Sequence, residues 1–560
     1  MDKRLKHLKK HLSSSKKKDY NQQIKDISSI YDFKEFVWDE SFSIVQPENL
    51  NDYYKKGYFL FFDKKKQICV AISSLDCFLL ENTKDFNLDR IFLLHKENFK
   101  KTLFDISSEF NTKLAQSYLQ ETTRFHSAKN VDYNKVVLGF SILFFSLMTL
   151  SINLFELINN VIYILQNILK SILFATGAKY PKEHSNDSFT KDFPIYSVLV
   201  PLYKEELKTE SILRAMTNLE YPKDKLDIKF ILEADDLITS KSLGVLDLPD
   251  YVEVIKVPKS FPRTKPKALN YAISFVKGEY LTVYDAEDEP EPRQLLKAIC
   301  AFSKLSPNYA CLQARLNFYN ANENMLSKFF SIEYSIWFDY LLKGLSGLSM
   351  PVTLGGTSNH FKVNVLKKIG LWDAYNVTED ADLGIRLYLN GYKVHMIDSI
   401  TMEESPTRLT DWLAQRSRWI KGFIQTLCVF TKTKVDYTIF SRTKALVVYI
   451  FVGLSTYSFL FLPWLLALLI LNLSPAWRFL WLINSLCLVL YMYVTAYFTM
   501  SRQNSFVKLN AIKNYFVFFL WPCYFILHTI AAYRSIWEVL KSPFKWNKTP
   551  HGNYEKFESN

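Results

Sequence analysis

The sequence predicts an α/β domain with a mostly parallel sheet, inserted between two groups of transmembrane helices and preceded by a small α+β domain. Two observations lead to this fold class. Long apolar runs without charged residues lie on both sides of residues 190–430, and about 20 such residues span a bilayer core. Between them, short apolar runs alternate with helical stretches, which is typical of parallel α/β sheets.

The chain begins with a basic tail, residues 1–19. Residues 1–18 hold eight basic side chains and one acidic side chain, which supply more than half of the net charge of +13 carried by the 560 residues. Such a tail is typical of the cytoplasmic side of a membrane, and it is equally compatible with a solvated segment. Because the positive charge gathers in the tail and not on a folded face, nucleic acid is not an expected partner.

Residues 20–130 form the predicted N-terminal domain. Tyr58–Phe62 and Ile68–Ile72 are apolar runs on either side of a charged turn, which indicates two strands. Lys113–Ser127 has the pattern of a helix. The segment contains no recognisable catalytic group of residues, and the chain has no P-loop motif, so an ATPase is not supported.

Five apolar runs are long enough to enter a membrane. Two precede the α/β domain and predict two passes within residues 136–177, where only Lys170 interrupts the second run and could reach an interface. Three follow it and predict a bundle of three or four helices over residues 445–533, because the first of them, with 33 residues, is long for one helix and short for two. The runs are Val136–Phe155, Leu157–Gly177, Ala445–Trp477, Phe479–Ser501 and Asn514–Tyr533.

Several runs of this length in one chain argue against buried core helices of a soluble protein. With the basic tail inside, two passes return the chain to the cytoplasm, which places residues 178–444, and with them the α/β domain, there. Residues 534–560 are expected to form a cytoplasmic or interfacial tail. The predicted protein is therefore integral to the cytoplasmic membrane and in contact with its lipids.

Three apolar runs predict buried strands of one parallel sheet: Ser197–Pro201, Lys229–Leu232 and Tyr280–Tyr284. Helical stretches such as Leu295–Leu305 lie between or after them. The first run closes on a turn, and the other two end on acidic residues. Because ligands bind at the carboxyl ends of the strands in such sheets, we expect these acidic residues to line a binding site.

Five short motifs with charged or polar side chains follow one another in this domain. Alone, each is a common solvated turn or helix start. In this order, with the first three at strand ends, they predict one active site. The motifs are Pro201-Leu-Tyr203-Lys-Glu205, Glu233-Ala-Asp235-Asp236, Asp285-Ala-Glu287-Asp288, Thr378-Glu379-Asp380 and Gln415-Arg-Ser-Arg418-Trp419.

This series resembles the family-2 glycosyltransferases with a GT-A nucleotide-sugar-binding domain, in the membrane-embedded group that includes cellulose, hyaluronan and related β-glycan synthases. The resemblance covers residues 190–430 by motif and extends to the carboxyl terminus by architecture. Residues 20–130 resemble the amino-terminal domain found ahead of secretion-type ATPases and of some membrane glycosyltransferases. Four further strings agree with the family: 264–270, 355–360, 379–386 and 548–552.

The resemblance implies a Mg²⁺ or Mn²⁺ cofactor. Asp285 and Glu287 match the family's Asp-x-Asp pair, with Glu in the place of the usual second Asp, and the neighbouring Asp288 is a further candidate ligand. Hard divalent cations prefer such oxygens and can neutralise the charge of a departing diphosphate. The alternative interpretation is an exposed acidic turn.

The resemblance also implies a nucleotide-sugar donor. The first motif and Glu233 would hold uracil and ribose, and Lys265 or Lys267 would contact the diphosphate, although Glu233 stands where the family usually has Asp. Lysines on a solvated loop are the alternative. The implied donor-binding residues are Pro201, Tyr203, Glu205, Glu233, Lys265, Lys267 and Asp285.

Inversion at the anomeric carbon requires a base that takes the proton from the attacking hydroxyl. The family's Thr-Glu-Asp motif supplies it, so the resemblance implies Asp380 as the base and Glu379 as a supporting carboxylate. Acidic residues after Thr378 are also good helix-start sequence, and the two roles are compatible.

Gln415, Arg418 and Trp419 form the family's QxxRW motif, which implies contacts with the acceptor and the diphosphate. An indole face is a flat platform for a sugar ring, and a guanidinium binds phosphate oxygens. An interfacial helix with an anchoring Trp is the alternative, and the position shortly before the membrane run favours a combination of both.

The expected function is that of an inverting, metal-dependent hexosyltransferase. It would add sugars from a nucleotide donor, a UDP-sugar, to a growing β-glycan or exopolysaccharide acceptor and export it through the membrane helices, with accessory export proteins as further candidate partners. One alternative is a non-processive transferase with a lipid or lipid-linked acceptor, which product length would distinguish. The other is a catalytically silent receptor or scaffold, and the presence of Asp285, Glu287 and Asp380 argues against it.

Overall fold

The computed structural model of the chain describes residues 111–181, 192–470, 475–501 and 511–546, together with residue 108 and five short strands between residues 34 and 93. The chain divides into two compact units: Met1–Ala115 with Tyr271–Lys277, and Gln116–Asn270 with Gly278–Asn560. The predicted basic tail, residues 1–19, and the family string at 548–552 lie outside the described residues.

The first unit contains a five-stranded sheet in the order β1-β5-β4-β3-β2. Its β3 and β4 pair in antiparallel fashion, with Tyr58 opposite Ile72, which confirms the two strands predicted around the charged turn. The strands are β1 (Lys34–Glu35), β2 (Ser43–Ile44), β3 (Tyr58–Phe62), β4 (Ile68–Ile72) and β5 (Ile91–Leu93).

The second unit is built on an eight-stranded sheet in the order β10-β13-β11-β12-β9-β6-β7-β8. The four strands from β9 to β8 run parallel, β12 is antiparallel to both of its neighbours, and β11 and β13 are again parallel. The mostly parallel sheet is thereby confirmed. The strands are β6 (Tyr196–Leu202), β7 (Leu226–Glu233), β8 (Val252–Val257), β9 (Tyr280–Val283), β10 (Glu289–Pro290), β11 (Tyr309–Phe318), β12 (Asn359–Lys362) and β13 (Lys393–Glu403).

The central strands are continuous apolar runs because both faces of the sheet are covered. Every residue of β7 is buried, and the ammonium of its Lys229 is neutralised by Asp227 at 2.9 Å and Glu253 at 2.6 Å. Apolar side chains of α8, α9 and α11 pack against β6 and β7. These helices are α8 (Thr209–Thr217), α9 (Leu237–Gly244) and α11 (Gln294–Lys304), and α11 confirms the helix predicted at 295–305.

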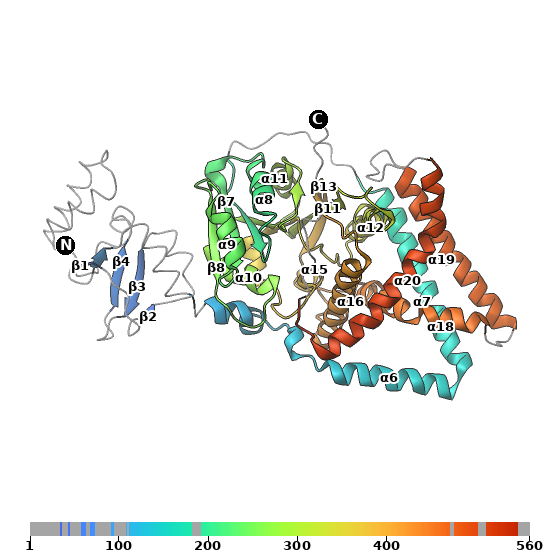
Figure 1. Cartoon of the computed structure of the whole chain (residues 1–560). Helices are drawn as coiled ribbons and strands as arrows, with labels where there is room; N and C mark the ends of the chain where they lie inside the picture. The colour runs from blue at the N-terminus through green and yellow to red at the C-terminus, as the bar shows by residue number, and fades with distance from the viewer. Residues whose placement is uncertain are drawn as a thin grey trace. The chain divides into compact units, whose positions relative to one another are not determined.

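The second unit contains further helices (Figure 1). Among them, α16 packs against the final helix α20 and so joins the α/β domain to the predicted membrane bundle. The helices are α10 (Lys265–Ala272), α12 (Met325–Ile336), the π-helical turn η6 (Trp337–Leu341), α13 (Leu342–Gly347), α14 (Val363–Lys368), α15 (Glu379–Leu389), α16 (Leu409–Lys432) and α20 (Ala511–Lys541).

Four helical stretches among the described residues are long and apolar enough to cross a membrane: Tyr133–Leu150, Ile152–Ala178, Arg442–Pro463 and Phe479–Ser501. The first two are α6 (Tyr133–Leu150) and α7 (Ile152–Ala178). The third lies in a continuous helix made of α17 (Arg442–Val448), the π-helical turn η7 (Tyr449–Leu454) and α18 (Ser455–Ile470), and the fourth lies in α19 (Pro475–Ser501).

The 33-residue uncharged run, Ala445–Trp477, belongs to two helices, since α18 ends at Ile470 and α19 begins at Pro475. The last predicted membrane run, Asn514–Tyr533, lies within α20. Residues 445–533 therefore contribute to three long helical stretches in the part of the chain that the structure describes: α17 to α18, α19 and α20.

Polar side chains of α7 are matched by partners on α18 and α19. The hydroxyl of Tyr163 donates to the carbonyl of Ser458 at 2.9 Å, the hydroxyl of Ser458 donates to Gln166 at 2.8 Å, and the amide of Asn167 donates to Asn484 at 3.3 Å. In an apolar solvent, helices associate through such interhelical hydrogen bonds and through close packing.

Two glycines allow α7 to touch the α/β domain backbone to backbone. A Cβ on Gly177 would stand 1.9 Å from the carbonyl oxygen of Tyr340, and a Cβ on Gly344 would stand 2.1 Å from that of Leu173. The rings of Phe174 and Tyr340 stack at 4.2 Å beside this crossing. Small residues permit helix axes to approach this closely, so the crossing fixes α7 against the wall formed by η6 and α13.

We expect Gly177→Ala to lower the free energy of unfolding by about 1–3 kcal/mol, because the added methyl has no space and the helices must separate. Thermal unfolding of the purified protein in detergent measures the effect. Gly139→Ala on α6 is the matched control, since nothing lies within 4 Å of its Cβ position, and it should be neutral or slightly stabilising. Equal stability of the two variants would contradict the role of the crossing.

Candidate active site

One cavity of about 700 Å³ lies at the carboxyl ends of β6, β7 and β9. It collects twelve of the residues predicted from the sequence, although they are spread over more than 200 positions of the chain. They are Pro201, Tyr203, Glu205, Glu233, Lys265, Asp285, Glu287, Glu379, Asp380, Gln415, Arg418 and Trp419. The same cavity continues to α7, α18, α19 and α20, where Lys170, Thr456, Tyr491 and His528 line it.

The turn after β6 is held by the segment after β7. Lys204 has a φ of +54°, and its backbone N–H donates to Asp236 at 2.6 Å. The N–H of Glu205 donates to the hydroxyl of Thr239 at 3.0 Å. These bonds fix the first motif so that Pro201, Tyr203 and Glu205 face the cavity.

Glu233, at the end of β7, forms a buried ion pair with Lys267 at 2.7 Å. Burial raises the pKa of the Glu233 carboxyl, and the charge of Lys267 opposes this effect. One carboxylate oxygen of Glu233 has no hydrogen-bond partner among the described residues. Lys267 itself is fully buried and does not line the cavity, so of the two predicted lysines only Lys265 faces it.

Lys265 bridges two loops at the floor of the cavity. Its ammonium lies 2.5 Å from Asp285 and donates to the carbonyl oxygen of Gly356 at 2.7 Å. Burial acts to lower its pKa, but the carboxylates of Asp285 and Glu379 outweigh burial and raise the pKa to about 12. Lys265 is therefore a permanent cation beside the acidic motif.

Asp288, the third carboxylate of the predicted metal set, does not line the cavity. It is buried and accepts hydrogen bonds from the backbone N–H of Asp285 at 2.8 Å and from the hydroxyl of Thr357. Burial and the neighbouring carboxylates raise its pKa well above the usual range. Asp288 thus shapes the loop, and the carboxylates that face the cavity from this motif are Asp285 and Glu287.

Two carboxylates are compatible with a divalent cation. Mg²⁺ commonly takes one or two carboxylates and completes its shell with water and substrate phosphates. The described residues contain no group of three or more Asp, Glu, His or Cys arranged to hold a metal by themselves. Asp285 and Glu287 on the cavity wall fit a cation that arrives with a diphosphate.

Glu379 and Asp380 begin α15, as the capping sequence predicts. Burial, together with the charge of Asp380, raises the pKa of Glu379 to about 7, and burial also raises the pKa of Asp380. One oxygen of Asp380 accepts the N–H of Ala381 at 2.7 Å, while a Cβ on Gly356 would stand 3.3 Å from the other. A carboxylate of this kind can take a proton near neutral pH.

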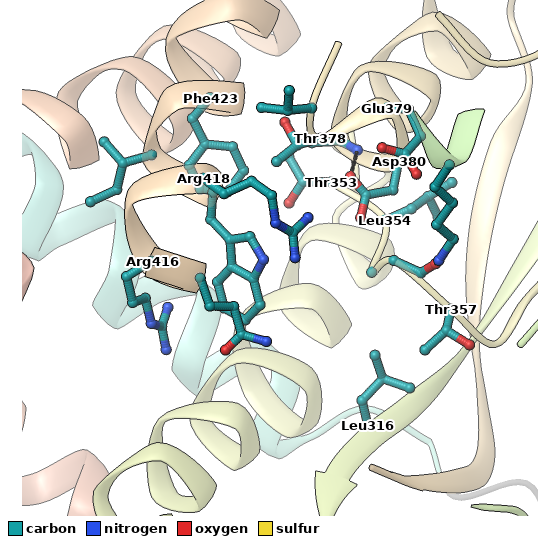
Figure 2. Close-up of a pocket in the computed structure, with 18 of the residues that line it drawn as sticks. Leu316, Thr353, Leu354, Thr357, Thr378, Glu379, Asp380, Arg416, Arg418 and Phe423 are labelled. Carbon is teal, nitrogen blue, oxygen red and sulfur yellow. Dashed lines mark hydrogen bonds between the residues drawn. The ribbon is translucent and has the colours of Figure 1, made fainter. Parts of the chain in front are cut away.

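The helix that carries the last motif, α16, lies directly against the start of α15. A Cβ on Gly422 would stand 2.2 Å from the hydroxyl oxygen of Thr378, so only glycine permits this contact. Figure 2 shows Arg418 extending from α16 toward Thr353 and Thr378, while Arg416 points to another side. Arg418 is close enough to Asp380 to lower the pKa of that carboxyl.

Trp419 lies in an aromatic wall. Its ring stacks with Tyr334 at 5.9 Å, and the guanidinium of Arg416 lies 4.5 Å from the ring centre. Buried polar atoms of Gln415 and Arg418 have no hydrogen-bond partner among the described residues. Flat rings beside unpaired polar groups suit a polyhydroxylated ligand.

Several charged residues of the cavity were not predicted from their motifs: Arg263, Glu333, Glu403 and Arg416. Arg263 pairs with Asp235 of the second motif, and Arg416 pairs with Glu333 of α12. Lys170 had been predicted only as an interruption of a membrane run. The basic string before Lys265 was a usable signal for Arg263, whereas the others depend on contacts between distant elements.

Comparisons with known proteins agree with this geometry. Residues 280–530 match the family model described as glycosyl transferase family group 2. The probable glycosyltransferase YdaM of Bacillus subtilis is 26% identical over 390 residues, which cover 65% of this chain and 89% of that protein. The β-monoglucosyldiacylglycerol synthase of Trichormus variabilis is 28% identical over 262 residues, which cover 45% of this chain and 53% of that protein.

Among solved structures, the mannosyltransferase PcManGT of Pyrobaculum calidifontis, in complex with GDP-Man and Mn²⁺, is 16% identical with a TM-score of 0.45. The match covers 68% of this chain and 99% of that one.

A mostly parallel sheet whose strand ends carry acidic residues into one cavity, together with the family match, defines a GT-A-like transferase fold. The chain is an enzyme, a glycosyltransferase whose residues 280–530 match family group 2.

Proposed function

We propose that this glycosyltransferase is inverting, metal-dependent and processive, and that it adds sugars from a nucleotide donor, a UDP-sugar, to a growing β-glycan or exopolysaccharide. The observation that carries the proposal is the continuity of one cavity from the strand ends, past Asp380 and Trp419, to the helices that are apolar enough to span a membrane. A donor site, a base and a path toward the membrane thus share one space.

At the donor end, the turn 201–205 and Glu233 hold the nucleoside, while Lys265 and Arg263 lie near the diphosphate. Asp285 and Glu287 hold Mg²⁺ or Mn²⁺. The cation, when bound, neutralises the charge that develops on the leaving diphosphate. The ion pair between Lys265 and Asp285 keeps this floor of the cavity in place before the donor arrives.

Asp380 acts as the base. The acceptor hydroxyl oxygen attacks the anomeric carbon, the bond from that carbon to the diphosphate breaks, and the hydroxyl proton passes to the Asp380 carboxylate. Glu379 lies beside it in the first turn of α15 and, with a pKa raised to about 7, adds negative charge as the pH rises through that value. Attack from the face opposite the leaving group inverts the anomeric centre.

The terminal sugar of the acceptor packs on Trp419, and Arg418 reaches toward the diphosphate. The catalytic domain faces the cytoplasm, where nucleotide sugars are made, and the product leaves through the membrane helices with accessory export proteins. If vesicles given labelled donor retained all polymer on the catalytic side, the export part of this proposal would fail.

The transfer rate should rise as the pH is increased above the ordinary carboxylate range, because burial raises the pKa of the base Asp380. The neighbouring Glu379, whose pKa burial and the charge of Asp380 raise to about 7, adds negative charge to the pair as it ionises. A base with a raised pKa stays protonated, and inactive, up to a higher pH than an ordinary carboxylate, which ionises near about 4. Initial rates at saturating donor measure this dependence, with UDP affinity across the same pH range as the control. A rate that is already constant above about pH 5 would contradict it.

The function is tested by incubating the purified full chain in nanodiscs with a panel of labelled UDP- and GDP-sugars and Mg²⁺ or Mn²⁺, followed by linkage and length analysis. We expect a long β-linked product from one UDP-sugar. A single sugar added to a lipid would instead support the non-processive alternative, which the similarity to a diacylglycerol-lipid synthase keeps in view. If none of the donors in the panel yields a product, the result would support the catalytically silent scaffold.

A further inference from the structure

Lys170 is the only basic residue of α7, a helix apolar enough to span a membrane, and its side chain lines the cavity. Within the described residues its ammonium has no hydrogen bond and no ion pair within 4.0 Å. Removing an unpaired charge from water is costly, and ionisable residues of membrane segments usually serve a ligand or a pathway. The position of Lys170 on the cavity wall therefore indicates that its charge interacts with a partner.

Glu333, the acidic group that interacts with Lys170, is not free to serve as that partner. Glu333 is close enough to interact electrostatically with Lys170, but its carboxylate is already used by other partners. One oxygen accepts from Arg416 and from the hydroxyl of Tyr524 at 2.7 Å, and the other lies 3.3 Å from His528. Each of these partners comes from α16 or α20.

The membrane-side end of the cavity consequently carries more positive than negative charge. Lys170 and Arg416 lie there with Glu333 as their acidic neighbour, and the Nε of Arg416 has no hydrogen-bond partner among the described residues. The donor end differs, because Asp285, Glu287 and the α15 carboxylates accompany Lys265 and Arg263 on its wall, and a divalent cation would offset their charge when a diphosphate binds. An anionic group at the membrane-side end would instead be paired by the protein's own cations.

The cation of Lys170 is not needed for the donor. The diphosphate of a nucleotide sugar would meet Lys265 and Arg263 at the strand ends, whereas Lys170 lies on a membrane helix. Hydroxyl groups of a neutral glycan are satisfied by neutral partners, such as the unpaired hydroxyl of Tyr491 that also lines the cavity. An ammonium without a partner points to an anionic group on the ligand.

We propose that the membrane-side end of the cavity binds a glycan that carries anionic substituents, carboxylate or phosphate, and that Lys170 is the residue that pairs with them. This inference deepens the proposed function and rests on it, because the glycan in question is the growing acceptor chain. Lys170 then contributes to acceptor specificity, whereas Asp380 and Trp419 act on any acceptor sugar.

The test uses the purified full chain in phosphatidylcholine nanodiscs and three probes of equal length and linkage: β-1,4-linked hexaglucuronate, cellohexaose and 6-phosphorylated cellohexaose. We expect the wild type to bind at least one anionic oligomer about tenfold or more tightly than cellohexaose. Lys170→Met should remove this preference, and Lys170→Arg should retain it. Lys179→Met removes the same charge from the exposed end of α7, outside the cavity lining, and should bind as the wild type does.

Lys170→Met replaces an unpaired ammonium with an apolar group, so it should fold, and its thermal unfolding is measured beside the wild type. Equal affinity of the wild type for all three oligomers would overturn the proposal, as would an anionic preference that Lys170→Met keeps. If phosphatidic acid in the nanodiscs inhibited sugar transfer by the wild type, and the anionic oligomers did not bind, the proposal would be overturned in favour of a lipid phosphate as the anionic ligand.

The donor panel separates this inference from the proposed function. A wild type that makes no polymer but shows a Lys170-dependent preference for anionic oligomers would refute the processive function and support the site. A wild type that makes long polymer and has no anionic preference would support the function and refute the site.

Discussion

Asp380→Asn should reduce sugar transfer by at least about 10²-fold and leave the affinity for UDP nearly unchanged. Asn has the size of Asp but cannot accept the hydroxyl proton, and its side chain can still accept the N–H of Ala381. The proposed nucleotide contacts lie on other elements, at the ends of β6, β7 and β9. Initial rates with labelled donor and binding of UDP by calorimetry measure the two effects separately.

Asp411→Asn is the matched control for this variant. Asp411 lies in the first turn of α16, as Asp380 lies in the first turn of α15, but it does not line the cavity. The control should therefore transfer sugar at the wild-type rate. Turnover retained by Asp380→Asn would exclude Asp380 as the base, and loss of UDP binding would show that the change acts through the fold.

Asp285→Asn should abolish the dependence of nucleotide binding on Mg²⁺ or Mn²⁺. It should also lower the rate of sugar transfer about as much as Asp380→Asn does. The change removes one of the two carboxylates by which the 285–288 motif faces the cavity and leaves the ammonium of Lys265 without its ion pair. The Lys265 ammonium can still attract a diphosphate, so we expect weak UDP binding that no longer depends on Mg²⁺ or Mn²⁺. Titration of UDP with and without each cation checks this result.

Asp288→Asn separates a metal ligand from a structural carboxyl. Asp288 is buried away from the cavity and accepts from the backbone of Asp285 and from Thr357. We expect this variant to keep its metal dependence and to lose thermal stability. Full turnover of chelator-treated wild-type protein would refute the metal role altogether, and loss of metal dependence in Asp288→Asn would return Asp288 to the ligand set.

The sequence motifs located the cavity because parallel strands end at the same edge of a sheet, and that edge is set by the pattern of apolar runs. The prediction was weaker for side-chain direction. Lys265 and Lys267 belong to one basic string, but on a helix two residues apart differ in direction by about 200°. Lys265 faces the cavity while Lys267 pairs with Glu233 beneath it.

Other residues could not be predicted because their surroundings are assembled from distant segments. Asp288 is turned away from the cavity by Thr357, which arrives from a loop 69 residues later. Glu333 receives partners from α16 and α20, between 83 and 195 residues away. No local pattern reports such contacts, so the acidic triplet suggested three ligands where two face the cavity, and Glu333 carried no signal.

The contact between Gly422 and Thr378 constrains how a polymer could advance. Because the two helices touch with no gap, the indole of Trp419 and the carboxylate of Asp380 are parts of one close-packed body, and such packing does not stretch. A mechanism in which the enzyme pulls the polymer forward would require Trp419, which holds the acceptor sugar, to move relative to the base Asp380. On the proposed function, this close packing favours a mechanism in which the sugar chain moves while Trp419 and Asp380 keep their relative positions. After each transfer, the new terminal sugar would move past Trp419 when the nucleoside diphosphate leaves. The polymer would then advance through an active site whose side chains do not move relative to one another.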